Sequence, residues 1–267
     1  MTYVLGRTDA EYARLREQAR IWADATGALL DAVALKPGAR CLDVGCGPGE
    51  TMRTMAARVG PSGQVVGVDV DGDLGRTAVA ALSAEGYGNC AFVEGDIASG
   101  DPVPAGGFDL VFGRLILLHV ADPVAVLRRM WSWTAPGGVL VVQDYDMRGV
   151  DTYPPLAVLD EWRRVFLGTF TAIGRDVGLG RRLPSLFAEA TGALPDGTQV
   201  AGRLDRFATS GGMLAATYRS VTPAGIALGT VTQEEADAFQ ASIAEAIRSY
   251  PDHQALWPLL VGAYRRR

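Results

Sequence analysis

The sequence predicts an α/β fold, a doubly wound and mostly parallel sheet of seven strands with helical insertions that form a cap. Five short apolar runs, near 41–44, 65–68, 90–93, 108–112 and 139–142, carry this prediction. Between them lie segments whose apolar residues recur at the three- and four-residue spacings of a helix. Strands that alternate with helices pair in parallel, so we expect the first five strands to form one parallel sheet.

The first apolar run leads into a glycine-rich turn. Gly45, Gly47 and Gly49 follow the run 41–44 at a spacing of two. Glycine adopts positive φ readily and lets a ligand approach the backbone closely. The next segment, 50–59, has one apolar face, so its first helical turn points free N–H groups at whatever lies on the glycines. The pattern indicates a ligand-binding turn, with a purely structural tight turn as the alternative.

A carboxylate ends the second run. Asp69 lies about twenty residues after Gly49, where α/β nucleoside-binding folds place the acid that accepts hydrogen bonds from ribose. The glycine spacing is G-x-G-x-G, whereas the dinucleotide fingerprint is G-x-G-x-x-G, and Glu50 beside the helix start would repel a pyrophosphate. An NAD-dependent dehydrogenase is therefore the less favoured alternative.

Roughly residues 36 to 145 resemble the class I S-adenosylmethionine-dependent methyltransferases of the small-molecule type, in which the glycine turn holds the methionine end of the cofactor. The resemblance implies S-adenosylmethionine as cofactor and S-adenosylhomocysteine as product. It puts the carboxylate of Asp96 near the adenine amino group and Ile97 on the ring, although an Asp at a strand end often only caps a turn. The candidate cofactor contacts are Gly45, Cys46, Gly47, Gly49, Asp69, Val70, Asp96 and Ile97.

Residues 1–35 are expected to be helical after a short extended start. Thr8 and Glu11 have the spacing of a capping box, and the apolar residues that follow fall on one stripe. Such a helix packs on the domain formed by the rest of the chain, 36–267. The resemblance adds that this N-terminal segment folds over the cofactor as a lid, with Tyr3 and Gln18 as candidate contacts.

Candidates for the chemistry follow the fourth and fifth strands, at the sheet edge where open α/β folds bind ligands. Arg114 either pairs with a carboxylate of the cofactor or substrate, or with a structural acid. Asp144 and Tyr145 are expected to face the methyl acceptor, and Asp144 would act as a base only if burial raised its pKa. His119 is a further candidate base, although a structural histidine inside an apolar run is the favoured interpretation.

The sequence predicts no metal site. Asp144 and Asp146, at i and i+2, have the chemistry to hold Mg²⁺, but shaping of the pocket is the favoured role. His119 and His253 are the two histidines of the chain, too few and too far apart for a histidine-based metal cluster.

From about 151 the regular alternation is interrupted. Large apolar residues at helical spacing run through 156–170, and Thr232 with Glu235 repeats the capping box before another helix. These insertions resemble those by which small-molecule methyltransferases roof their acceptor pocket. We expect cap insertions at about 151–180 and 208–250, a helix at about 182–191, a sixth strand near 198–207 and a seventh from 256 to 264.

Composition limits the partners. The net charge of −5 argues against a nucleic-acid footprint. No apolar run reaches the roughly 18 residues that span a bilayer, and the start of the chain lacks a signal-peptide core. The three cysteines contain no C-x-x-C pair, which suits a reducing compartment. We therefore expect a cytoplasmic protein without nucleic-acid or membrane partners, and the sequence leaves a homodimer open.

The predicted reaction is transfer of the cofactor's methyl group to an oxygen, nitrogen or carbon atom of a small, largely apolar molecule, with specialised metabolites as one class. The alternative is a protein that keeps the fold and binds the cofactor but catalyses a non-methylating reaction.

Overall fold

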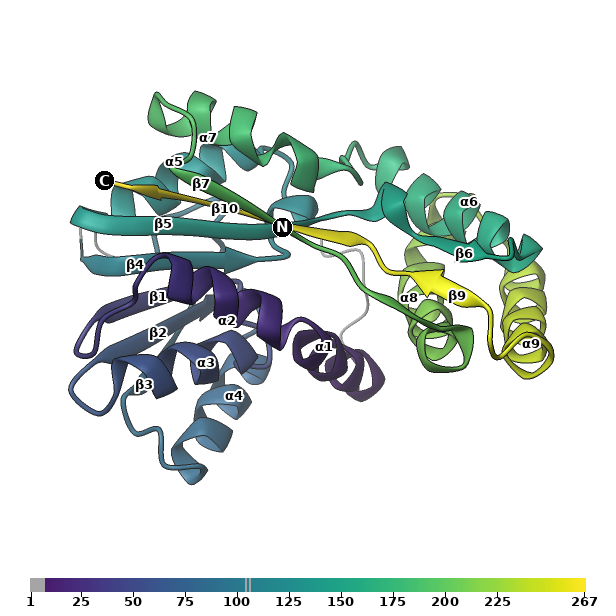
Figure 1. Cartoon of the computed structure of the whole chain (residues 1–267), viewed down its shortest axis with the longest axis horizontal. Coiled ribbons are helices and arrows are strands. Elements are labelled where there is room, and N and C mark those ends of the chain that lie inside the picture. The colour runs from purple at the N-terminus through teal and green to yellow at the C-terminus, as the bar shows by residue number, and fades with distance from the viewer. Residues whose placement is uncertain (1–7, 104, 106) are drawn as a thin grey trace.

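The structure is a computed structural model that describes residues 8–103, 105 and 107–267. Its centre is a seven-stranded sheet of order β3-β2-β1-β4-β5-β10-β7 (Figure 1). Strands β1 to β5 are mutually parallel, and β10 runs antiparallel between β5 and β7. The predicted mostly parallel, seven-stranded fold is confirmed. The strands are β1 (Arg40–Val44), β2 (Gln64–Asp69), β3 (Cys90–Glu94), β4 (Phe108–Arg114), β5 (Thr134–Asp146), β7 (Gly197–Ala201) and β10 (Leu259–Arg266).

Helices cover both faces of this sheet. One face carries α2 (Ala23–Ala32), α3 (Glu50–Val59) and α4 (Gly72–Ala84), and the other carries α5 (Pro123–Trp133) and α7 (Leu183–Thr191) (Figure 1). Because both faces are covered, the central strands are apolar on both sides and read as continuous apolar runs in the sequence.

A second layer, which we call the helical cap, lies beyond the carboxyl ends of the parallel strands. It contains α6 (Ala157–Ala172), α8 (Phe207–Ala227) and α9 (Gln233–Ser249) (Figure 1). A three-stranded sheet accompanies these helices, with β6 (Asp151–Tyr153), β9 (Gln254–Leu256) and β8 (Leu204–Arg206) in the order β6-β9-β8. The role of these segments as a roof over an acceptor stays a prediction.

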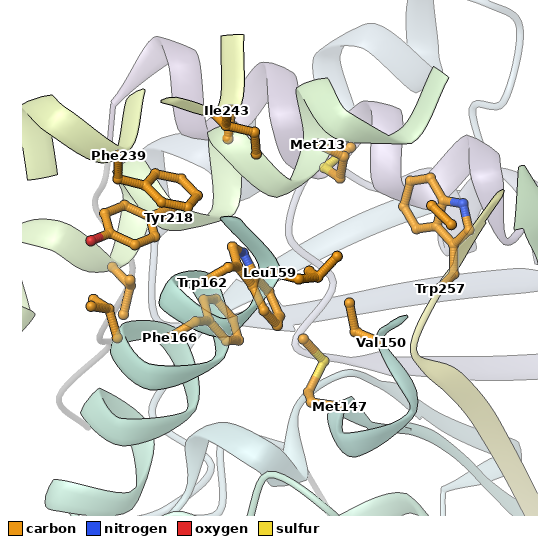
Figure 2. Packing of buried hydrophobic residues seen from close by; sticks show 14 of the residues in the cluster. Met147, Val150, Leu159, Trp162, Phe166, Met213, Tyr218, Phe239, Ile243 and Trp257 are labelled. Carbon is orange, nitrogen blue, oxygen red and sulfur yellow. The ribbon is translucent and has the colours of Figure 1, made fainter. Parts of the chain in front are cut away.

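Aromatic side chains hold the helical cap together. The rings of Trp162 and Phe166 stack at 4.7 Å within α6, and Tyr218 of α8 stacks on Phe239 of α9 at 3.7 Å. Figure 2 shows these side chains facing one another between the helices. The capping box predicted at Thr232 and Glu235 is present at the start of α9. The large apolar residues at helical spacing therefore build a second core.

Three boundaries differ from the prediction. The N-terminal helical stretch is two helices, α1 (Asp9–Ile21) and α2, which meet at the buried Trp22. The strand expected near 198–207 is split, because the chain leaves the main sheet after β7 and pairs next in the small sheet as β8. The last strand begins at Leu259, three residues later than expected, because Leu256 is the end of β9.

The cysteines carry no disulfide, and two of the three thiols, those of Cys41 and Cys46, are buried. Of the helices in the described ranges, none combines the length and the apolar character needed to cross a membrane. The cytoplasmic location stays a prediction.

Candidate functional site

A cavity of about 170 Å³ lies at the carboxyl ends of β1, β2, β4 and β5, beneath α1 and the helical cap. This is the edge at which open α/β sheets bind ligands. Helix α1 lies between α3 of the sheet layer and α8 of the cap (Figure 1). The cavity therefore has a wall of strand ends and turns on one side and a wall of helices on the other.

The glycine turn forms part of the first wall. Gly45 and Gly47 both line the cavity and have φ of +71° and +48°. A Cβ placed on Gly47 would meet no atom within 4 Å, whereas one on Gly45 would clash with Ile116. Cys46 between them also lines the cavity. The turn thus exposes its backbone to the cavity at Gly47, where the side chain of any other residue would occupy part of the cavity.

The structure does not bring Gly49 into this wall. Gly49 is the residue before α3, with φ of +79°, and a Cβ there would lie 3.0 Å from the Cβ of Ala78 in α4. In this structure the glycine allows α3 and α4 to approach closely, and its contact with the cofactor stays a prediction.

Asp69, at the end of β2, joins the turn to the second strand. One carboxylate oxygen accepts the N–H of Gly47 at 2.9 Å and the other accepts the N–H of Asp71 at 3.0 Å. Each oxygen keeps a further lone pair, so the carboxylate can still accept hydrogen bonds from a ligand. Val70 beside it lines the cavity too. Burial raises the pKa of Asp69, and the two backbone N–H donors act against that rise.

Asp96 and Ile97 lie after β3 on the same wall. Asp96 accepts the N–H of Ala98 at 2.9 Å, which is the turn-capping role that the sequence offered as its alternative. The Ile97 side chain is 4% exposed and presents an apolar surface to the cavity.

Asp43, inside β1, is a site residue that sequence reasoning missed. Its side chain is 2% exposed and lines the cavity, and its Oδ2 has no hydrogen-bond partner among the described residues. Burial raises the pKa of Asp43, and the charge of Arg114 offsets part of this rise. The resulting pKa is about 7. A carboxylate within an otherwise apolar buried strand was the available signal, because such a group is costly unless something satisfies it.

Arg114, at the end of β4, lines the cavity as predicted from its place in the sequence. Its Nη1 donates to Thr26 Oγ1 at 3.1 Å, and the Thr26 hydroxyl donates to Gln143 Oε1 at 2.8 Å. Burial lowers the pKa of Arg114 and the charge of Asp43 raises it. The cavity wall thus contains an acid and a guanidinium that interact electrostatically.

Helix α1 supplies polar groups to the opposite wall. Arg14 forms a buried two-pronged ion pair with Glu11, at 2.8 and 2.6 Å, and donates to Gln18 Oε1 at 3.0 Å. Gln18 in turn donates to the hydroxyl of Tyr145 at 2.9 Å. Gln18 therefore lines the cavity as a link between α1 and β5. Tyr3 lies outside the described residues.

Tyr145 and His119 line the cavity from the sheet side. Burial raises the pKa of Tyr145 to about 12 and lowers the pKa of His119 to about 4. The His119 ring lies 5.8 Å from the ring of Phe170. Both groups are therefore neutral at pH 7, and neither is a strong base there.

The structure does not bring Asp144 into the cavity, although the sequence suggested that it faces the acceptor. Its two oxygens accept the N–H groups of Leu118 at 3.1 Å and of Tyr145 at 2.9 Å, and its side chain is fully buried. Burial raises the pKa of Asp144 to about 7. Asp144 supports the short 3-10 helix η1 (Leu117–His119), which itself borders the cavity.

Asp146, the other carboxylate weighed for Mg²⁺, pairs with Arg181 and accepts the N–H of Arg148. Within residues 8–103, 105 and 107–267, no group of three or more potential metal-ligating side chains is found.

Comparisons with known proteins agree with this architecture. Residues 35–166 match the family described as "Methyltransferase domain". The nocamycin O-methyltransferase of Saccharothrix syringae is 40% identical over 111 residues, 41% of this chain and 39% of that protein. The trans-aconitate 2-methyltransferase of Paracidovorax citrulli is 33% identical over 120 residues, 45% of this chain and 44% of that protein. The chain thus spans less than half the length of these two relatives.

Among solved structures, the YcgJ protein of Bacillus subtilis superposes with a TM-score of 0.59. The superposition covers 92% of this chain and 99% of that one at 17% identity, which shows a shared fold. The matched family spans β1 to β5 and the cavity wall that they form. Residues 35–166 of the chain are thus a methyltransferase domain of the class I S-adenosylmethionine-dependent type.

Proposed function

We propose that this protein binds S-adenosylmethionine in the cavity and transfers its methyl group to a small, largely apolar molecule. The observation that carries the proposal is the Oδ2 of the buried Asp43, which has no hydrogen-bond partner among the described residues. It lies in a cavity that Arg114 and the open backbone of Gly47 also line. The methionine end of the cofactor carries one ammonium and one carboxylate. An acid that lacks a hydrogen-bond donor and a buried guanidinium are the complementary pair.

Other parts of the same wall fit the rest of the cofactor. Both oxygens of Asp69 accept hydrogen bonds from backbone N–H groups, and each keeps a lone pair that can accept another from a ribose hydroxyl. Ile97 offers an apolar surface to a flat ring, with the carboxylate of Asp96 beside it. We assign these residues, with Gly45, Cys46 and Val70, to cofactor binding.

The cofactor supplies an activated methyl group on a sulfonium centre, so the contribution of this chain is to position the reactants. The Glu11–Arg14 pair and the Gln18–Tyr145 hydrogen bond hold the side chains of α1 that cover the cavity opposite the strand ends. A closed cavity keeps water from the reacting atoms and holds them in line.

The helix wall supports an apolar acceptor. Leu15, Phe166 and Phe170 line it, and the charge of Arg14 is neutralised by its ion pair with Glu11. Two relatives are named for small acceptors, nocamycin and trans-aconitate. Because His119 and Tyr145 are weak bases at pH 7, we expect an acceptor atom that is already nucleophilic or readily deprotonated, such as a carboxylate, an enol or an amine.

Calorimetry with S-adenosylhomocysteine and screening of carboxylic acids, enols, phenols and amines with labelled cofactor test the proposal. We expect product binding in wild type, at least tenfold weaker binding in Asp43→Asn, and label in one acceptor class. Binding of NADH in place of S-adenosylhomocysteine would overturn the cofactor assignment. Cofactor binding with a reaction product that contains no label would instead support the non-methylating alternative.

A further inference from the structure

A smaller cavity of about 40 Å³ adjoins the main one. The two share Gln18, Tyr145, Met147 and Thr217 as lining residues, so a single layer of side chains separates them. A water-sized group needs roughly 10–15 Å³ of such space. The smaller cavity, which we call the side pocket, therefore has room for a group of about two to four heavy atoms.

The side pocket is built from the helical cap. Trp162 of α6 and Met213 of α8 form part of its wall, and Trp257, which follows β9, forms another part (Figure 2). Val150, after β5, and Leu214 of α8 are further apolar residues of the lining.

Polar atoms in this lining already have partners. Trp162 Nε1 donates to Thr217 Oγ1 at 3.1 Å, and Trp257 Nε1 donates to Asp205 Oδ2 at 2.9 Å. The hydroxyl of Ser210 donates to the backbone carbonyl of Arg206, the residue before its helix, at 3.4 Å. A polar substituent would find few free partners there, whereas an alkyl group would gain from burial.

The layer of side chains between the two cavities contains one hydrogen-bonded pair and one flexible apolar side chain. The Gln18–Tyr145 hydrogen bond crosses it, and Met147 is an unbranched side chain that fits around differently shaped neighbours. A molecule bound against the apolar helix wall of the main cavity can therefore place a branch beside Met147 without breaking an ion pair.

We infer that the side pocket selects the acceptor by binding a short alkyl substituent of it, about two to four carbons long. This inference rests on the proposed function, because it assumes that the acceptor lies in the main cavity next to the cofactor. It identifies Leu214, Met213 and Trp257 as residues that determine acceptor specificity.

Calorimetric titration of phenol and of 4-methyl- to 4-pentylphenol, with S-adenosylhomocysteine bound, tests the inference. Phenol and its alkyl derivatives are probes whose ring suits the aromatic helix wall and whose chain varies by one methylene. In wild type we expect affinity to rise about fourfold per methylene until the pocket is full, and then to level off.

Leu214→Phe fills the side pocket and should remove this dependence on chain length. Ser210→Val fills it from another position and serves if Leu214→Phe folds poorly. Ile226→Phe, on the same helix but 40% exposed and outside both linings, is the matched control and should keep the wild-type dependence.

The affinity for S-adenosylhomocysteine is measured in each variant and should not change. Absence of chain-length dependence in wild type, or its persistence in both filled variants, would overturn the inference. Failure of S-adenosylhomocysteine to bind wild type would instead overturn the proposed function, so the two failures are distinguishable.

Discussion

Carboxylates around the cavity differ in how completely the chain itself satisfies them. Asp144 has both oxygens on backbone N–H groups and lies outside the cavity. Asp69 also has both oxygens engaged but borders the cavity. Asp43 keeps one buried oxygen that accepts no hydrogen bond from the part of the chain that the structure describes. Because an unsatisfied buried acceptor costs stability, Asp43 is the residue whose position makes most sense with a ligand bound.

Replacing Asp69 with alanine should weaken binding of S-adenosylhomocysteine by about 1–3 kcal/mol. The change removes the proposed ribose acceptor and releases the N–H of Gly47. Calorimetry measures the effect, and Asp73→Ala, at a side chain 92% exposed, is the control. Equal affinity in wild type and Asp69→Ala would show that the ribose lies elsewhere.

Tyr145→Phe should lower turnover about three- to tenfold and leave the affinity for the cofactor nearly unchanged. The variant keeps the ring and its packing against Trp22 but removes the hydroxyl that accepts from Gln18. Loss of one neutral hydrogen bond that positions the acceptor corresponds to about 1 kcal/mol. Steady-state kinetics on the identified acceptor check it, and full activity would leave His119 as the next residue to vary.

The turn between β1 and α3 contains two glycines that are needed for different reasons. Gly47 faces the cavity, and Gly49 faces α4. Both have positive φ, so both resist any other residue for the same backbone reason. They differ in what a side chain would meet.

Gly47→Ala and Gly49→Ala should therefore have different consequences. Each costs roughly 1–2 kcal/mol of backbone strain. Gly49→Ala should lose more stability, because its Cβ lies 3.0 Å from that of Ala78. Gly47→Ala should lose more affinity for the cofactor, because its Cβ enters the cavity. Denaturant unfolding and calorimetry on both variants check this, and the opposite ranking in either measurement would contradict it.

At the scale of the whole molecule, buried acids make stability depend on pH. Burial raises the pKa values of Asp43 and Asp144 to about 7 in the folded chain, whereas carboxyls of an unfolded chain titrate near about 4. Between these values the folded chain holds protons that the unfolded chain has released. The contribution of these two groups to stability therefore falls as pH rises from about 4 to about 7.

Asp43→Asn should flatten this dependence in the ligand-free protein. Each unit of pKa difference between folded and unfolded chain corresponds to about 1.4 kcal/mol, so the change in slope is measurable. Urea unfolding at a series of pH values from 4 to 7 compares wild type, Asp43→Asn and the exposed control Asp160→Asn. Identical slopes in wild type and Asp43→Asn would show that Asp43 titrates normally.

Strands β1 to β5, most of the helices between them and the glycine turn follow from the sequence alone, because they depend on spacing within a short segment. The small sheet of β6, β9 and β8 does not follow from it. Apolar runs flanked by turns and apolar residues at helical spacing are local patterns, so the parallel sheet and the cap helices α6 and α9 could be predicted. Gly45, Gly47, Asp69 and Arg114 were predicted in the same way, since the carboxyl ends of parallel strands must meet at one edge. Asp96 was predicted from the family resemblance instead.

Which side chains face the cavity depends on contacts between segments that are far apart in the sequence. Asp144 is turned away from it by a hydrogen bond to Leu118, 26 residues earlier, and Tyr145 is bound by Gln18, 127 residues away. In the sequence, Asp43 is one residue of a buried strand. The structure shows that its Oδ2 lacks a hydrogen-bond donor among the described residues. Side-chain orientation at a strand end depends on hydrogen-bond partners from segments that are distant in the sequence. No local sequence pattern shows which distant residues will be those partners.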